Sequence, residues 1–471
     1  MKLRQPELKE FFTPSLAMTG RVESWIDNPV RRYPVSCTVM VVEDTMDEHR
    51  DGLEGSWQFA SKALRYGAGV SIHLSKLRPR GTENKHGMVA SGPCGFMEIY
   101  SKFNEILRRG GTYRNGAIVC QLDADHPDIV EFITYDRAKI PWVKRTVNVT
   151  PEILKDDRLL EVIMEGARKG DIWIVKKQYD KKGERIYHNV CQEILLKSRD
   201  TCLLSHINLS AIPIVDIPSA MVHGIEFLCS LYQKTGVHKS GIYKKQDNQV
   251  GLGILGLSNL LAIENVSYKD FLQSLRKVNL GIKLNYLLPS DMIAGAIATG
   301  YKEAAKVAKR FNMSRAFTIA PTASCAYRYT DREGYTCTPE IAPPISREVD
   351  RDSSTLGVQS YKFNPKCEIA QEVGWDTFFE LNAEWQVMMD KTELAHAISM
   401  NWWSDMTTMN KDFMSRWIES PLKSLYYSLQ VLPDTQDKSN VYAALDNTDV
   451  DSYLSEILSN ENEQITCDCA E

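Results

Sequence analysis

The sequence predicts an α/β fold. Short strand-like runs alternate with amphipathic helical patterns from about residue 30 to residue 430, and this alternation is typical of α/β architectures. Apolar residues make up 43% of the chain and charged residues 25%, which is the composition of a globular protein with a sizeable core. A length of 471 residues accommodates two or three units or one large α/β barrel.

The predicted strands are short runs rich in β-branched residues. They cover residues 36–42, 68–74, 116–122 and 171–177. Two predicted helices follow the first and second of these strands, at residues 54–67 and 95–111. Both have the apolar spacing of an amphipathic helix and end in glycine, a frequent helix terminator. No fixed-period repeat is found along the chain.

The chain divides into a short N-terminal segment at residues 1–30, one large unit at residues 31–430 and a tail at residues 431–471. The tail carries ten Asp or Glu residues and one Lys, and it has no long periodic apolar face. We therefore predict a flexible acidic tail. It ends in Cys467-Asp468-Cys469, and two cysteines at the tip of such a tail suggest redox chemistry, with incidental cysteines as the alternative.

The bulk charge and the absence of targeting signals narrow the function classes. A formal net charge of −5 gives no support for nucleic-acid or membrane partners. No apolar run of membrane-spanning length and no N-terminal signal core are seen, so we expect a cytoplasmic protein (in the host cytoplasm if the source is a virus). In that reducing compartment the eleven cysteines are not expected to be static disulfides. Most are expected to be small buried apolar residues.

One short stretch carries the most chemical information. Asn189, Cys191 and Glu193 alternate along the chain, so in an extended loop their side chains lie on one side. An amide, a thiol and a carboxylate over one small volume suggest a reactive sulfur with a hydrogen-bonding group and an acid or base. Taken alone the pattern is weak, and a buried structural cysteine is the alternative.

Further motifs stand in a fixed order around this stretch, and each contains a reactive or hydroxyl-bearing residue. They are Ser36-Cys37, Thr201-Cys202 followed by Leu204-Ser205 and Asn208-Leu209, Pro321-Thr322-Ala323-Ser324-Cys325, and Leu425-Tyr426-Tyr427. Together with the tail, this series resembles the large (catalytic) subunit of ribonucleotide reductases, especially class I, over roughly residues 13 to 430. The resemblance implies the ten-stranded α/β barrel of the ribonucleotide reductase and glycyl radical enzyme superfamily, with Cys191 on a finger loop inside.

The resemblance also implies a role for each matching residue in the reduction of a ribonucleotide. Cys191 becomes the thiyl radical that abstracts a hydrogen atom from the ribose, Glu193 is the base at the 3′ hydroxyl, and Asn189 hydrogen-bonds a sugar oxygen. Cys37 and Cys202 are the reducing pair, which Cys467 and Cys469 re-reduce with electrons from thioredoxin or a glutaredoxin. Cys467 and Cys469 are closer in sequence than the tail pair usually is in the family, which leaves the reduction potential of their disulfide open.

The resemblance also assigns binding residues. Substrate contacts fall on Thr13, Ser36, Gly69, Thr322, Ala323, Ser324 and Cys325. An ordinary helix cap is the alternative reading of the Thr322 segment. A nucleoside triphosphate effector is expected at Asp44 and Arg78, with residues 110–116 as a mobile loop. The alternatives here are a turn aspartate and a solvated arginine.

The source of the radical is assigned from Tyr426 and Tyr427, which resemble the stacked pair that relays a radical in class I enzymes. A class I chain itself needs no metal or other cofactor, because a ferritin-like, metal-containing small subunit supplies the radical. The alternative is an adenosylcobalamin-dependent class II enzyme. Class III enzymes carry a glycyl radical near the C-terminus, and residues 431–471 contain no glycine.

The same resemblance sets expectations for substrate and regulation. Ribonucleoside diphosphates are the favoured substrates, and a homodimer is a family expectation. Only twelve residues precede Thr13, so we expect no N-terminal ATP-cone and no inhibition by dATP through one. Two other functions were weighed: a nucleotide-binding regulatory protein that has lost catalysis, and an unrelated cysteine oxidoreductase with a flavin or nicotinamide. The complete cysteine set argues against the first, and the absence of a Gly-x-Gly-x-x-Gly motif argues against the second.

Overall fold

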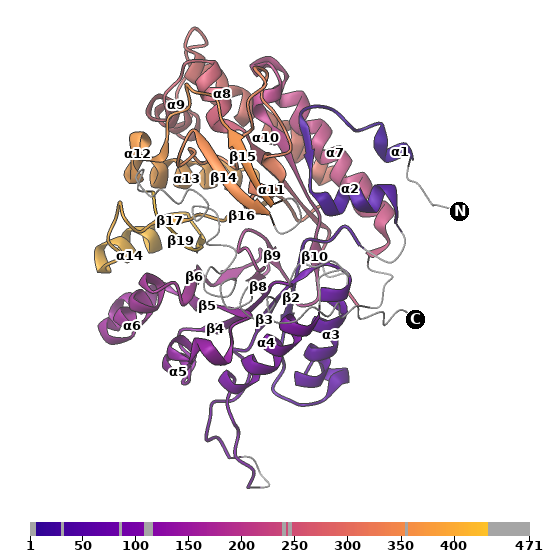
Figure 1. Ribbon diagram of the computed structural model, residues 1–471, viewed down its shortest axis with the longest axis vertical. Helices are drawn as coiled ribbons and strands as arrows, with labels where there is room; N and C mark the ends of the chain where they lie inside the picture. Colours follow the sequence, from indigo (N-terminus) through magenta and orange to yellow (C-terminus); the bar gives the residue numbers. More distant parts are fainter. Residues whose placement is uncertain are drawn as a thin grey trace.

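Two β-sheets organise the protein. The computed structural model describes residues 6–29, 33–83, 87–107, 116–237, 242–243, 247–353 and 357–431. Figure 1 shows the early strands β2 to β6 in one half and the later strands and helices in the other. Helices pack on the outside of both sheets, which confirms the α/β class predicted from the sequence.

The first sheet has seven strands in the order β10-β2-β3-β4-β5-β6-β18. Strands β2 to β6 are parallel, and the two outer strands β10 and β18 are antiparallel to their neighbours. The bounds are β10 (Thr201–Cys202), β2 (Cys37–Val41), β3 (Gly69–His73), β4 (Ile118–Asp123), β5 (Val143–Val149), β6 (Ile172–Lys176) and β18 (Ser424–Leu425). Parallel strands need crossover connections, and helices supply them here.

The helices of this half connect its parallel strands. They are α3 (Leu53–Arg65), α4 (Met97–Ile106), α5 (Ile129–Thr134) and α6 (Asp157–Arg168). Helix α3 buries Phe59, Ala60, Ala63 and Leu64 on one face, as its apolar spacing predicts. All four predicted strands and both predicted helices are present within a few residues of their predicted ends. Strand β5 was not predicted.

The second sheet has five strands in the order β1-β11-β12-β13-β16. Strands β11 to β16 are parallel, and β1 is antiparallel to β11. The bounds are β1 (Leu16–Met18), β11 (Leu204–Asn208), β12 (Gln249–Leu255), β13 (Arg315–Ile319) and β16 (Ala395–Ile398). The longer helices of this half are α7 (Ile217–Thr235), α8 (Leu257–Ile263), α9 (Tyr268–Leu280), α10 (Pro289–Arg310) and α13 (Trp375–Asp390).

The two sheets meet through one continuous segment of chain. Strand β10 belongs to the first sheet and β11 to the second, with only Leu203 between them. The described strands include five parallel strands in one sheet and four in the other. This arrangement is consistent with a barrel of two half-sheets, and closure into ten strands remains an expectation.

Smaller elements complete the described chain. Strands β7 (Gln178–Tyr179), β8 (Arg185–His188) and β9 (Leu195–Leu196) form a three-stranded sheet, and two strand pairs are β14 (Glu348–Ser353) with β15 (Gly357–Lys362) and β17 (Trp402–Trp403) with β19 (Ser428–Leu429). The remaining helices are α1 (Pro6–Lys9), α2 (Gly20–Asp27), α11 (Ala323–Ala326), α12 (Ala370–Val373) and α14 (Lys411–Glu419).

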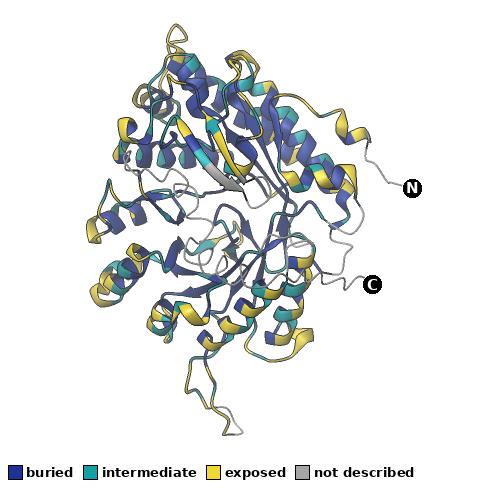
Figure 2. Cartoon of the chain, viewed as in Figure 1, coloured by how far each residue is buried: buried dark blue, intermediate teal, exposed yellow. Residues whose placement is uncertain are grey.

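The core lies between each sheet and its helices. Figure 2 shows helices that are buried toward the strands and exposed on their outer faces. Close packing of α7 depends on small residues. A Cβ added at Gly224 would lie 2.7 Å from Cδ1 of Ile207 on β11, and one added at Gly300 of α10 would lie 2.3 Å from Sδ of Met221. Glycine therefore lets α7 approach both the sheet and α10.

Helix α7 and the turn before it, Ile214–Thr235, are long and apolar enough to cross a membrane, although none was expected from the sequence. Half of the most apolar window is buried, and α7 packs against α10, β11 and β12. A core helix explains the same composition, so this is weak evidence for a span.

The predicted division at residues 30 and 431 stays a prediction. Within the predicted N-terminal segment, β1 joins the second sheet by pairing with β11. The predicted tail lies outside the described residues from residue 432 onward, and Cys467 and Cys469 lie there with it.

Candidate active site

The loop that carries Cys191 is a tight turn between β8 and β9. Strands β8 and β9 pair antiparallel, the Asn189 N–H donates to the Ile194 carbonyl at 3.0 Å, and the Gln192 N–H donates to the Asn189 carbonyl at 3.2 Å. Gln192 has a φ of 68°, in the left-handed region that non-glycine residues rarely adopt. His188 Nδ1 lies 2.7 Å from the Gln192 carbonyl oxygen. These contacts fix the loop from both sides.

The structure brings three sulfurs together. Cys37 on β2 and Cys202 on β10 are direct partners in the antiparallel pairing, although 165 positions separate them in the sequence. The Thr201 hydroxyl donates to the Cys37 carbonyl at 3.0 Å and supports this register. The Cys191 side chain lies next to Cys37 and Tyr426, and both act on the pKa of its thiol. All three cysteines are free thiols.

Two buried polar atoms beside the sulfurs lack partners within the described chain. They are Oε2 of Glu193 and Nδ2 of Asn189. Glu193 is 1% exposed and Asn189 is fully buried. The Asn189 side-chain oxygen accepts from the Ile194 N–H at 3.1 Å, which fixes the direction of the amide. Unpaired buried polar atoms are costly, and an acceptor next to a donor suits a ligand with neighbouring hydroxyl groups.

Burial holds the site in its neutral protonation states. It raises the pKa of Glu193 well above its usual value, and the adjacent Cys191 adds to the rise. The pKa of Cys191 is raised by its contact with Cys37 and then by burial, against the opposing effect of Tyr426. Burial, Glu193 and Asp200 together raise the pKa of Cys202. Protonated thiols are the form needed for hydrogen-atom chemistry.

The tyrosine pair lies beside Cys191, which acts on the pKa of Tyr426. Tyr426 and Tyr427 join β18 to β19 and are 2% and 7% exposed. Their ring centroids are 4.9 Å apart and the planes meet at 66°, so the rings meet edge to face. The stacked arrangement that the resemblance implied is therefore not found. The backbone fixes the two residues separately: the Tyr426 N–H donates to the Met400 carbonyl at 2.8 Å, and the Tyr427 carbonyl accepts from the Trp402 N–H at 3.3 Å. Trp173 of β6 packs 4.5 Å from the Tyr426 ring.

The substrate residues predicted from the first sheet lie next to the cysteines. The Gly69 N–H donates to the Ser36 carbonyl at 2.9 Å, and Gly69 is the strand partner of Cys37. A Cβ at Gly69 would lie 3.1 Å from Cγ2 of Val190 on the finger loop. The absence of a side chain there lets the loop approach β3.

The other predicted substrate residues belong to the second half. Thr322 is 2% exposed, and its hydroxyl accepts from the Glu340 N–H at 2.8 Å. The Thr322 N–H donates to the Glu340 carboxylate. Ala323 is half-buried and Ser324 is exposed, whereas the Cys325 thiol is buried and lies 3.3 Å from the Met18 carbonyl. Thr13 is exposed, and its hydroxyl lies 3.1 Å from that of Ser15.

The two predicted effector residues contact each other. The Arg78 side chain donates from Nε to Asp44 Oδ2 at 2.8 Å, and the Arg78 backbone N–H donates to Oδ1 at 3.2 Å. Both side chains remain partly exposed. Arg78 is therefore paired rather than simply solvated. Residues 110–115 of the predicted mobile loop lie outside the described residues, and Gly116 lies within them.

Several residues of the site were missed by sequence reasoning. Beneath the finger loop, Gln121 Nε2 donates to the His188 carbonyl at 2.9 Å and to Ser71 at 2.6 Å. Burial lowers the pKa of His73, which lies beside them, to about 3. Asp200, two positions before Cys202, was also missed. The signal in the sequence that could have identified these residues is a polar residue within or next to an otherwise apolar strand.

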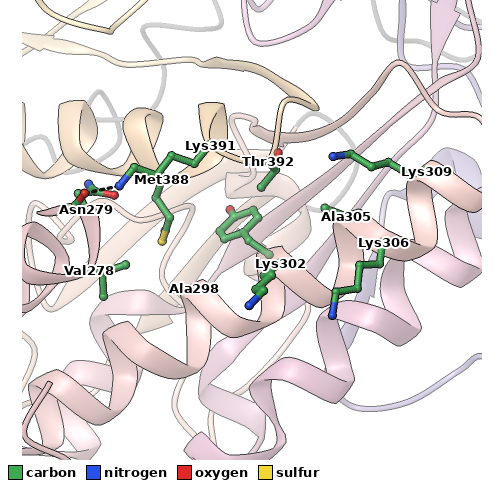
Figure 3. A pocket seen from close by; sticks show the side chains of 11 residues that line it. Val278, Asn279, Ala298, Lys302, Ala305, Lys306, Lys309, Met388, Lys391 and Thr392 are labelled. Atoms are coloured by element: carbon green, nitrogen blue, oxygen red, sulfur yellow. Dashed lines mark hydrogen bonds between the residues drawn. The ribbon is translucent and has the colours of Figure 1, made fainter. Parts of the chain in front are cut away.

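One cavity among the described residues lies away from this site. It has a volume of about 410 Å³ and lies among α9, α10 and α13 (Figure 3). Four lysines line it together with apolar residues: Lys302, Lys306, Lys309 and Lys391. None of the predicted site residues belongs to it. Within the described residues, no group of three or more His, Cys, Asp or Glu side chains is arranged to hold a metal ion.

A known protein family matches the part of the chain that forms most of the first sheet. Residues 35–165 match the family described as "Ribonucleotide reductase, barrel domain". The segment contains β2 to β5 and begins just before Cys37.

The sequence relatives are named as vitamin B12-dependent enzymes. A vitamin B12-dependent ribonucleoside-diphosphate reductase of Mycobacterium tuberculosis is 24% identical over 276 residues, covering 49% of this chain and 39% of that protein. A vitamin B12-dependent ribonucleotide reductase of Agrobacterium fabrum is 31% identical over 102 residues, covering 22% of this chain and 8% of that protein. The chain thus spans well under half the length of these relatives.

The fold matches over a longer range. The class Id ribonucleotide reductase alpha subunit of Actinobacillus ureae superimposes with a TM-score of 0.63 and 17% identity, covering 88% of both chains. At this identity the likeness concerns the fold alone. The chain therefore matches the barrel domain of ribonucleotide reductases over residues 35–165 and shares the fold of a class Id alpha subunit over most of its length.

Proposed function

We propose that the chain is the catalytic subunit of a ribonucleotide reductase that uses thiyl-radical chemistry to make deoxyribonucleotides. One observation carries the proposal: the Cys191 thiol lies within reach of Cys37, whose direct strand partner is Cys202. Glu193 and Asn189 face the same site with unpartnered buried atoms. A buried cysteine without function needs none of these neighbours.

The geometry supports a complete reaction. The Cys191 thiyl radical takes the hydrogen atom from C3′ of the sugar, and Glu193 takes the proton of the 3′ hydroxyl while Asn189 holds a sugar oxygen. The 2′ hydroxyl leaves as water with a proton from the Cys37–Cys202 pair. The pair supplies two electrons, gives its second hydrogen to C2′ and closes to a disulfide. Glu193 returns the proton to the 3′ oxygen, and Cys191 returns the hydrogen atom to C3′. A rigid loop in a preorganised, buried site favours each step.

The favoured substrates are ribonucleoside diphosphates. The Mycobacterium tuberculosis relative is named for them. Ala320, two positions before Thr322, packs in one apolar cluster with Cys202, and Gly69 is the strand partner of Cys37, so we propose that these two segments hold the phosphates and the sugar of a nucleotide. Asp44 and Arg78 are the proposed effector contacts.

Two sources of the radical are supported by different observations. The relatives' names favour adenosylcobalamin, which supplies an organic radical by homolysis of its cobalt–carbon bond. The specific observation for a ferritin-like small subunit is the buried Tyr426–Tyr427 pair that ends at Cys191. The names give the cobalamin alternative the stronger support from sequence, and the tyrosine contact is the reason to test a separate subunit.

The remaining partners follow from the same chemistry. A disulfide between Cys37 and Cys202 must be reduced after each turnover, so we propose thioredoxin or a glutaredoxin as the electron donor, acting through Cys467 and Cys469. A homodimer and a cytoplasmic location complete the proposal.

The test is reduction of CDP by the purified chain with a dithiol. It is run alone, with adenosylcobalamin, and with a candidate radical-generating subunit. We expect Cys191→Ser to lower turnover by roughly 10³-fold or more, as for other essential reacting groups. The matched control is Cys229→Ser, at a fully buried thiol of α7 outside the site, which should retain turnover. A Cys191→Ser variant that still makes dCDP would contradict the proposal.

A further inference from the structure

Asp200 is a buried carboxylate that the proposed reaction does not use. It is 0% exposed and lies just before β10, two positions from Cys202. Its oxygens accept three N–H groups: Thr201 N–H at 2.8 Å, Gln249 Nε2 at 2.8 Å and Asp247 N–H at 3.2 Å. Its backbone carbonyl accepts from the Thr38 hydroxyl of β2 at 2.7 Å. Asp200 therefore ties β10 to the strand that carries Cys37.

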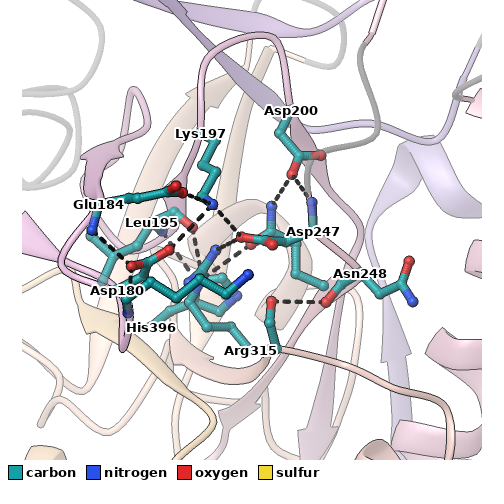
Figure 4. Close-up of polar contacts among 12 residues, drawn as sticks. Asp180, Glu184, Leu195, Lys197, Asp200, Asp247, Asn248, Arg315 and His396 are labelled. Carbon is teal, nitrogen blue, oxygen red and sulfur yellow. Dashed lines mark hydrogen bonds and ion pairs between the residues drawn. The ribbon is translucent and has the colours of Figure 1, made fainter.

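A buried arginine extends this contact to the finger loop. Arg315 is 6% exposed, and its Nε donates to Gln249 Oε1 and to the Leu195 carbonyl, both at 3.1 Å. Its Nη2 donates to Asp247 Oδ2 at 3.0 Å. Figure 4 shows Asp200, Asp247 and Arg315 in one connected group. Leu195 lies two positions after Glu193, so the group reaches both the reducing pair and the radical loop.

The charges around Cys202 come from four elements. Glu193 of the finger loop and Asp200 at the start of β10 act against its thiolate, and Arg315 of β13 favours it. Tyr232 of α7 faces both Asp200 and Cys202. Farther out, Lys197 contacts Asp180, Glu184 and Asp247. Burial raises the pKa of Asp200 to about 7, against the hydrogen bonds from the Thr201 and Asp247 N–H groups, so the Asp200 carboxylate is ionised at the alkaline pH where a thiol with a raised pKa titrates.

We propose that Asp200 is a positioning residue for the reducing pair: through Gln249 and Arg315 it fixes β10 opposite Cys37, and it places a negative charge beside the Cys202 sulfur. That charge disfavours the thiolate, which is the form that attacks external disulfides. The resting pair is then oxidised slowly by other disulfides and remains available for the substrate. The inference rests on the proposed function for the role of the two cysteines.

The test reaction needs no turnover. Oxidised dithiothreitol, a cyclic disulfide, converts the two thiols to the Cys37–Cys202 disulfide and is itself reduced to the dithiol. One protein thiolate attacks a sulfur of the reagent and opens its ring, and the second protein thiol displaces the reduced reagent from the mixed disulfide. Two electrons and two hydrogens pass to the reagent. The rate is followed by quenching in acid and mass analysis of labelled cysteine peptides.

The variants separate charge from packing. In Asp200→Asn the pH midpoint of the oxidation rate should fall by roughly one unit, because a like charge is lost beside the thiol. Above about pH 8, where Asp200 is ionised in the wild type, the rate should rise about threefold, since lower thiol basicity offsets part of the gain in thiolate. Gln249→Met removes the hydrogen bond and keeps the charge, so its midpoint should stay at the wild-type value. Arg315→Gln should move the midpoint upward.

The outcomes are distinguishable. An unchanged midpoint in Asp200→Asn overturns the inference, as does an equal downward shift in Gln249→Met or Arg315→Gln, which would indicate loosened packing. Arg315→Gln keeps the test open where Asp200→Asn does not fold. Failure of Cys37 and Cys202 to form a disulfide in the wild-type chain would instead overturn the reducing-pair part of the proposed function.

Discussion

At the scale of single residues, the site combines buried neutral groups with two unsatisfied atoms. Glu193 has a raised pKa because it is buried and lies beside Cys191. Its Oε2 and the Asn189 Nδ2 make no hydrogen bond within the described chain. Such atoms cost folding stability, and a bound sugar with neighbouring hydroxyls would satisfy both. The free protein is therefore less stable than it would be with a ligand that satisfies these two atoms.

Glu193→Gln separates these two effects. Turnover should fall about 10²–10⁴-fold, because the variant lacks the general base. The wild-type kcat/KM should rise with pH through a midpoint well above 4.5, since a base must be ionised, and this limb should disappear in the variant. The measurement is the pH profile of CDP reduction. If the variant keeps the rise of kcat/KM with pH, a group other than Glu193 is responsible for that rise.

The same substitution is expected to affect stability differently from turnover. A carboxyl group whose folded-state pKa lies above its unfolded value stabilises the fold below the unfolded pKa, and this contribution is lost as pH rises through the folded pKa. Glu193→Gln should therefore unfold no more easily than the wild type near neutral pH, and its stability should depend less on pH. Urea denaturation at several pH values tests this. Strong destabilisation at neutral pH would mean that the carboxylate is ionised and paired in the fold.

At the scale of secondary-structure elements, strand pairing creates the site. The antiparallel pairing of β10 with β2 places Cys202 opposite Cys37, and the β8–β9 turn brings Cys191 to them. Helix packing supports this arrangement from outside: α7 lies on β11 through Gly224, where an added Cβ would meet Ile207 and Leu252.

Gly224→Ala should destabilise the protein by about 1–3 kcal/mol, because an inserted methyl group overpacks the core. The control is Gly95→Ala, where an added Cβ meets no atom within 4 Å. The measurement is the urea midpoint followed by tryptophan fluorescence. Equal stability of Gly224→Ala and the wild type would show that α7 can shift away from the sheet at little cost.

At the scale of the whole molecule, the two half-sheets supply different parts of the site. The first contributes Cys37, Cys202 and Gly69, and the second leads into the Thr322 segment. Strand β18, which directly precedes the tyrosine pair, pairs with β6, so the C-terminal part of the described chain joins the first sheet. The route by which a radical reaches Cys191 is therefore a property of the assembled molecule.

Tyr427→Phe tests that route once the radical source that supports turnover is known. With a separate subunit the variant should lose turnover almost completely, because phenylalanine cannot be oxidised at the potential of tyrosine. With adenosylcobalamin it should retain at least about half of the wild-type rate, since phenylalanine keeps the shape of the buried ring and volume-conserving core substitutions cost little. CDP reduction by both proteins under each condition is the measurement. Loss of turnover with adenosylcobalamin would give the tyrosine pair a role in both mechanisms.

The sequence by itself determined the α/β class and the strands near residues 37, 69, 118 and 172, and it supplied the set of candidate site residues, because β-branched runs and ordered motifs are local signals. Only the tertiary structure decided that Cys37 and Cys202 are strand partners, that the tyrosine rings meet edge to face, and that Asp200 and Arg315 lie behind the reducing pair. These relations join residues far apart in the chain. They depend on strand register and burial, which periodicity along the sequence does not specify.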